Sequence, residues 1–154
     1  MIETALIAVH VLAAAVWVGG TVALVFVAVP IVRSLEGAQR AALLAELGRR
    51  WRPLGWGALA VLVATGTGLA SEHGAFRSAD GAFDTVLAVK IALVVALAIA
   101  TYVHDFVLGP GLARQICAGE PQTLRPRLVL VGWTSFALTI AVPVLGVTLA
   151  ELSG

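Results

Sequence analysis

Residues 7–20 read IAVHVLAAAVWVGG, and this stretch decides how the rest of the chain is interpreted. It carries one histidine, His10, inside a long apolar run and one tryptophan, Trp17, seven residues later. Seven residues are two helical turns, so the two side chains share one face of a helix, about 10 Å apart along its axis. The other residues of that face are small, namely Ala13, Ala14, Gly20 and Thr21. Such a face leaves room beside the helix for a closely packed neighbour or for a flat ligand.

The composition predicts a membrane protein. The 154 residues are 60% hydrophobic and 12% charged, and the mean hydropathy is +0.99. Crossing about 30 Å of hydrocarbon takes about 20 helical residues, and four segments are long enough. We expect helices at about residues 4–33, 53–71, 84–108 and 127–150, forming one all-α domain, an integral membrane four-helix bundle. A lipid bilayer is then the main partner, and nucleic acid is not expected to be one.

The charges of the connecting segments predict an orientation. Eight of the nine arginines lie in residues 33–52 and 105–127, whereas the connection between the second and third helices carries only Arg77. Because Lys and Arg are enriched in cytoplasmic loops, we expect the two arginine-rich segments on the cytoplasmic side of a bacterial-type inner membrane. Both termini would then lie on the outer, periplasmic side.

Local signals predict where the helices begin and end. Three leucines recur at helical spacing in residues 38–47, so a short separate helix in the headgroup region is expected there. Pro53 would then occupy the first position of the second membrane helix. The sequence Gly-Pro-Gly at residues 109–111 predicts a turn that ends the third helix.

Counting along the helices brings two ionisable side chains to one depth. Because the first and third helices run in the same direction, His10 and Lys90 are both expected about 10 Å inside the outer boundary. Residues 65–68 and 143–146, on the two antiparallel helices, reach the same level. This layer collects an imidazole, an amine, two hydroxyls and several glycines, and it forms a pocket if these groups point inward.

Each of these residues also has a purely structural interpretation. An ionisable side chain at this depth costs roughly 3 kcal/mol on insertion scales, which favours a functional role. His10 can instead be a neutral imidazole that bonds a threonine or a backbone carbonyl, and Lys90 can extend its amine to the outer surface. Trp17 and residues 65–68 can likewise be helix-packing positions.

His104 and Asp105 form a second polar site near the inner end of the third helix. His104 lies twenty residues past Asp84, about 20 Å further in than His10. We therefore do not expect the two histidines to hold one cofactor between them. The inner pair is interpreted either as an interfacial hydrogen bond or as a separate proton or metal site.

The order of these motifs resembles the copper resistance D (CopD-like) membrane proteins. The resemblance covers about residues 5–111 and rests on the pattern His10-x6-Trp17 followed by Gly19-Gly20, on RWRPLGW at residues 50–56, on Lys90, and on His104-Asp105-Phe106. A broader similarity reaches the HemJ-type protoporphyrinogen oxidases. In those proteins the residues that match His10 and Lys90 are regarded as the functional pair and the histidine as a haem ligand, which implies the same roles here.

Three functions are open at this point. The first is binding of haem b in the outer half of the bundle for redox or electron-transfer work. His10 would be the axial ligand, and Lys90 would complete the coordination or neutralise a propionate. The further cofactor-binding candidates are Trp17, Thr65, Gly66, Gly68 and Arg77.

The second function is copper uptake or tolerance, with His10 and His104 as successive stations for the ion. Cu(I) prefers thiolate and thioether ligands, and the chain has one cysteine and one methionine. The third is a non-catalytic membrane subunit that only holds helices together or docks a partner. A redox partner would suit the first function and a metallochaperone the second, and a homo-oligomer is compatible with all three.

Overall fold

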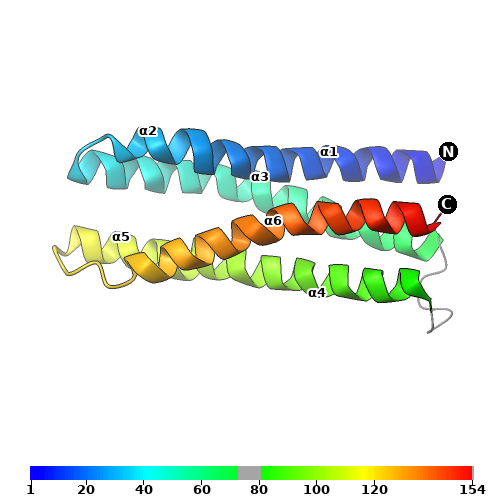
Figure 1. Ribbon diagram of the computed structural model, residues 1–154. Helices are drawn as coiled ribbons and strands as arrows, with labels where there is room; N and C mark the ends of the chain where they lie inside the picture. The colour runs from blue at the N-terminus through cyan, green and yellow to red at the C-terminus, as the bar shows by residue number, and fades with distance from the viewer. Residues whose placement is uncertain (73–80, 154) are drawn as a thin grey trace.

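The computed structural model describes residues 1–72 and 81–153, and this part of the chain is helical with short connections and no strand (Figure 1). The first long helix consists of α1 (Ile2–Ala23), a π-helical segment η1 (Leu24–Ala28) and α2 (Val29–Arg33). The second is α3 (Gly37–Glu72). The third consists of α4 (Ala82–Tyr102), a π-helical segment η2 (Val103–Leu108) and α5 (Gly109–Cys117), and the fourth is α6 (Arg125–Ser153).

Four helices are long and apolar enough to cross a membrane, as the sequence predicts. They are Ile2–Arg33, Gln39–Glu72, Ala82–Cys117 and Arg125–Glu151. Many large aliphatic side chains on their outer faces are exposed, which suits a lipid environment and not water. The chain is therefore a multi-pass membrane protein with an all-helical fold.

The four helices form two antiparallel hairpins. The first long helix packs along α3, and α4 packs along α6 (Figure 1). The hairpins meet through contacts of α1 with α6 and of α3 with α5. Both ends of the chain lie at one end of the molecule, and the two arginine-rich connections lie at the other (Figure 1).

The expectation of a separate interfacial helix at residues 38–47 is wrong. These residues are the beginning of α3, which continues through Pro53 as one helix to Glu72. Proline removes only one backbone hydrogen bond, and membrane helices tolerate it where neighbouring groups compensate. In the turn before Pro53, Glu46 forms ion pairs with Arg49 and Arg50, three and four residues further on, and these pairs favour an unbroken helix.

The expected turn at residues 109–111 is also wrong, because the third helix continues to Cys117. The helix widens to π-helical hydrogen bonding in η2, immediately before Pro110. η1 stands in the same relation to Pro30 in the first helix. Proline has no N–H and clashes with the carbonyl four residues earlier, and a π-bulge before it relieves this conflict without ending the helix.

Small residues set the spacing of the first hairpin. The indole of Trp51 on α3 lies against Gly20 on α1, where a Cβ would come within 2.0 Å of its Cη2 atom. The same indole lies beside Gly55, four residues further along α3, where a Cβ would be 3.1 Å from Nε1. Without water between helices, close contact at small residues is the main source of helix association in a bilayer. The Gly20–Trp51 contact therefore fixes the distance between α1 and α3.

Candidate functional site

His10 projects from α1 onto α3, where it bonds Thr65. His10 Nδ1 lies 2.7 Å from Thr65 Oγ1, and Thr65 is buried. The same hydroxyl lies 2.7 Å from the backbone carbonyl oxygen of Val61. A carbonyl can only accept, so the hydroxyl donates its one hydrogen to Val61 and accepts from His10. The neutral imidazole therefore carries its proton on Nδ1 and its lone pair on Nε2.

This tautomer is the one that a metal-ligating histidine needs. Such histidines commonly donate one ring N–H to a fixed oxygen while the other nitrogen coordinates the metal. Thr65 provides the fixed oxygen for Nδ1, and the backbone carbonyl of Leu62 also bonds the ring. The ring is thus held in place on α3, and Nε2 is the nitrogen that the Thr65 bond leaves for a ligand.

The predicted glycines differ in what they contact. A Cβ on Gly66 would lie 3.4 Å from Cε1 of His10, so Gly66 borders the imidazole. A Cβ on Gly68 would lie 3.2 Å from the side chain of Leu6, so Gly68 is a contact between α1 and α3. Gly66 thus borders the imidazole of the candidate site, whereas Gly68 packs against Leu6 of α1. Arg77, the remaining candidate, falls outside the described residues.

Lys90 extends from α4 to α6 within the second hairpin. Its Nζ atom lies 3.2 Å from the Cβ position of Gly146, so the amine occupies the space that a larger residue would fill. The amine and the imidazole come from different hairpins, and their levels can be compared through the bond that joins α1 to α6.

A hydrogen bond between Trp17 and Thr139 allows the levels of His10 and Lys90 to be compared. The Nε1 atom of Trp17 donates to Oγ1 of Thr139 at 3.2 Å, and this bond joins α1 to α6. His10 and Gly146 each lie seven residues from this bond toward the ends of the chain, which is about 10 Å of helix and two full turns. His10 and the Lys90 amine over Gly146 therefore lie at one level, above the point where the hairpins are tied together.

Trp17 itself belongs to the packed core. Its exposed fraction is 5%, and it clusters with Ala58, Leu59 and Leu97 from the neighbouring helices. Thr139 is only 2% exposed. Trp17 therefore closes the space beneath the His10 level, and its own polar atom is already satisfied by Thr139.

His104 and Asp105, the inner polar pair, contact each other and a tryptophan of α3. His104 Nδ1 lies 3.0 Å from Asp105 Oδ1, and Trp56 Nε1 donates to Asp105 Oδ2 at 3.3 Å. The other side of the His104 ring faces Gly132, whose Cβ position is 3.4 Å from Nε2. Arg52 lies over the ring of Phe106, and its Nε atom is buried with no hydrogen-bond partner in the described chain.

The two histidines lie on opposite sides of the Trp17–Thr139 bond. Gly132, which His104 contacts, is seven residues before Thr139, whereas Gly146 is seven residues after it. The two levels are thus fourteen residues apart on α6, or about 20 Å at 1.5 Å per residue. This agrees with the expectation that His10 and His104 do not share one ligand.

The sequence interpretation missed Thr139 as the partner of Trp17. A signal was present, because Gly132, Thr139 and Gly146 recur at intervals of seven residues and therefore lie on one face of α6. It also missed Trp56 as a hydrogen-bond partner of Asp105.

Comparisons with known proteins give no relative from which a role could be taken. No family model matches the chain, and no curated protein or solved structure matches it either.

Proposed function

We propose that this protein binds haem b in the half of the bundle nearest the chain ends and uses it for electron transfer. One observation carries the proposal. His10 is held through Nδ1 by Thr65, keeps Nε2 available, and lies at the level of the Lys90 amine from the opposite hairpin. The resemblance to HemJ-type and CopD-like proteins points to the same two residues.

The donor set agrees with haem in three respects. A neutral imidazole is the most common protein ligand of haem iron, and His10 has the tautomer that such a ligand requires. Lys90 supplies a positive charge or a second nitrogen donor. Gly66 and Gly146 have no side chains that would compete for the space next to these two groups.

Bound haem would supply one-electron chemistry, and the residues of the chain would supply position and environment. His10 would hold the iron through Nε2, with Thr65 fixing the plane of its ring. Lys90 would either be a second ligand or pair with a propionate. Trp17 would lie between the haem and the inner polar pair, His104 and Asp105, and separate the two.

A role in copper handling has weaker support. Among the described residues, no group of three or more His, Cys, Asp or Glu side chains could hold a metal ion. The sulfur ligands that Cu(I) prefers are absent from the His10 level, because Met1 is at the chain start and Cys117 ends α5 at the opposite end of the molecule.

Replacing Thr65 with valine tests the role of the fixed tautomer. The substitution keeps the shape of the side chain and removes the acceptor of the His10 Nδ1 proton. Loss of such an outer partner typically lowers metal affinity by about 10–100-fold. We expect a corresponding rise in the haem dissociation constant, measured by titrating haem into the apoprotein in detergent and following the Soret absorbance.

Thr67→Val is the matched control. Thr67 is exposed, two residues further along α3, and its hydroxyl bonds only backbone carbonyls of its own helix. Its replacement should leave the dissociation constant unchanged. Equal effects of the two substitutions, or none from Thr65→Val, would contradict the assigned role of Thr65.

We further propose that the arginine-rich end faces the cytoplasm and that the protein resides in a bacterial-type inner membrane. The support is the excess of arginines in residues 33–52 and 105–127. Cys117 is an exposed thiol at this end, so it reports on orientation. In intact spheroplasts, a membrane-impermeant maleimide should leave Cys117 unlabelled until the membrane is opened. Labelling before lysis would reverse the assignment.

A further inference from the structure

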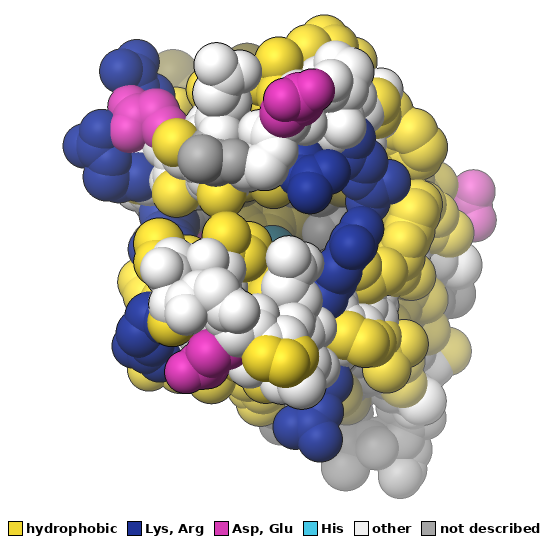
Figure 2. Space-filling model, turned by 90° about the vertical axis from the view of Figure 1, so that its left-hand side faces the viewer, with side chains coloured by type: hydrophobic (Ala, Val, Ile, Leu, Met, Phe, Trp, Pro, Cys, Tyr) yellow, Lys and Arg dark blue, Asp and Glu magenta, His cyan; other side chains and the backbone are white. Residues whose placement is uncertain are grey.

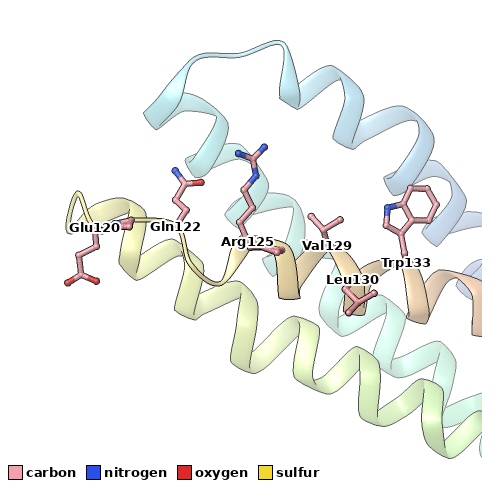
Figure 3. Close-up of a pocket in the computed structure, with 8 residues that line it drawn as sticks. Glu120, Gln122, Arg125, Val129, Leu130 and Trp133 are labelled. Atoms are coloured by element: carbon pink, nitrogen blue, oxygen red, sulfur yellow. The ribbon is translucent and has the colours of Figure 1, made fainter.

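A groove lies along the beginning of α6, at the end of the molecule where the arginines gather (Figures 2 and 3). Its volume is about 840 Å³. Figure 2 shows this end of the molecule, with Lys and Arg side chains around a hollow between the two hairpins. The groove is separate from the His10 level, so whatever occupies it is independent of the proposed haem.

The lining of the groove changes from charged to apolar along one face of α6. Arg125, Val129 and Trp133 follow at intervals of four residues, and Figure 3 shows their side chains on the same side of the helix. Glu120 and Gln122 join Arg125 at the polar end, and the carboxylate of Glu120 is directed away from Arg125 (Figure 3). Val129 and Trp133 lie about 6 and 12 Å further along the helix axis than Arg125.

The arginines near the polar end of the groove lie at the N-terminus of α6. The first turn of α6 has no acidic residue and carries both Arg125 and Arg127. A helix N-terminus is itself partially positive, so arginines are unfavourable there unless an anion is nearby. Within the described part of the chain, neither arginine has an ion-pair partner. The polar end of the groove therefore holds one guanidinium, that of Arg125, with which no described carboxylate pairs, although Glu120 also lines the groove.

We propose that this groove binds an anionic phospholipid. The phosphate would lie at Arg125 and Gln122, and one acyl chain would run along Val129 and Trp133. The order of these residues follows the order of polarity in a lipid, from headgroup to hydrocarbon, along a helix that is long and apolar enough to cross the membrane. Val129 and Trp133 are both exposed, Trp133 by 53%, so the apolar part of the groove is open to a chain from the bilayer.

The test is native mass spectrometry of the full-length protein released from detergent with added lipid. We expect the wild type to retain dioleoyl phosphatidylglycerol and to bind dioleoyl phosphatidylcholine more weakly. Arg125→Gln should weaken phosphatidylglycerol binding about fivefold, because this is the contribution of one basic residue to an anionic lipid surface. Trp133→Ala should weaken the binding of both lipids, since it removes the contact to the chain.

Arg114→Gln is the matched control. Arg114 is an exposed arginine on α5 at the same end, and it does not line the groove. Its substitution should leave phosphatidylglycerol binding unchanged, and far-UV circular dichroism should show equal helix content in all variants. Equal weakening by Arg114→Gln and Arg125→Gln would overturn the proposal, and so would equal retention of the two lipids by the wild type. Displacement of phosphatidylglycerol by millimolar inorganic phosphate, with no effect of Trp133→Ala, would show a site for a free anion and also overturn it.

Discussion

The His10→Ala variant is expected to lose bound haem b, so that the purified protein shows no Soret band. His10 is the residue that would hold the iron, so alanine at this position removes the proposed ligand. Even outer partners of metal ligands contribute about 10–100-fold to affinity, so loss of the ligand itself should lower haem content by more than about tenfold. The measurement is the pyridine haemochrome content per mole of protein, purified in mild detergent after expression with haem precursor.

His104→Ala is the control for this experiment. His104 is a second imidazole of the membrane part and lies next to Gly132 of α6, as His10 lies next to Gly66 of α3, but it is about 20 Å away along the bundle. The variant should keep the Soret band at its wild-type position. A colourless wild type that retains stoichiometric copper would favour the copper function, and a wild type with neither cofactor would favour a structural subunit. A Soret band that survives in His10→Ala and disappears in His104→Ala would move the haem to the inner pair.

The second large effect is expected at Gly20. Alanine there would bring its Cβ within 2.0 Å of the Trp51 ring. Because atoms cannot approach so closely, either the indole must shift or α1 and α3 must separate. Overpacking of this kind costs about 1–3 kcal/mol. We expect Gly20→Ala to lower the free energy of unfolding by that amount, measured by titrating the detergent-solubilised protein with sodium dodecyl sulfate.

Gly19 provides a neighbouring control, because a Cβ built there meets nothing within 4 Å. Gly19→Ala should therefore be neutral or slightly stabilising, since alanine favours the helix more than glycine does. A double-mutant cycle adds a second check. In a Trp51→Ala background, Gly20→Ala should cost little, because the ring it would strike is gone. Additive effects of the two substitutions would show that the Gly20–Trp51 contact does not set the hairpin spacing.

The two predictions concern one arrangement. His10 and Gly20 lie on the same long helix, and both contact α3, His10 at Thr65 and Gly20 at Trp51. A change in spacing at Gly20 would alter the approach of His10 to Thr65 ten residues away. Gly20→Ala should therefore also reduce haem affinity, whereas His10→Ala should affect the spacing at Gly20 less, because alanine creates no clash.

Much of the candidate site could be predicted from the sequence by counting. The levels of His10, Lys90, Thr65 and Gly146 follow from the constant rise of a helix and from the apolar length that a membrane requires. The structure agrees in the contacts it shows at this level, His10 with Thr65 and Lys90 with Gly146. Counting fails at the helix ends, because Pro53 and Pro110 predict boundaries but both lie within continuous helices.

The sequence by itself determined the helical class, the number of membrane-length helices and the position of each polar residue along its helix. These are properties of single segments, set by apolar length and backbone geometry. Only the tertiary structure decided which polar groups bond one another. The Thr65 hydroxyl that fixes the His10 tautomer and the Thr139 hydroxyl that ties Trp17 across the hairpins are examples. Such bonds depend on how far each helix is rotated about its own axis, and that rotation is set by contacts such as Gly20 with Trp51, which form only when separate segments pack together.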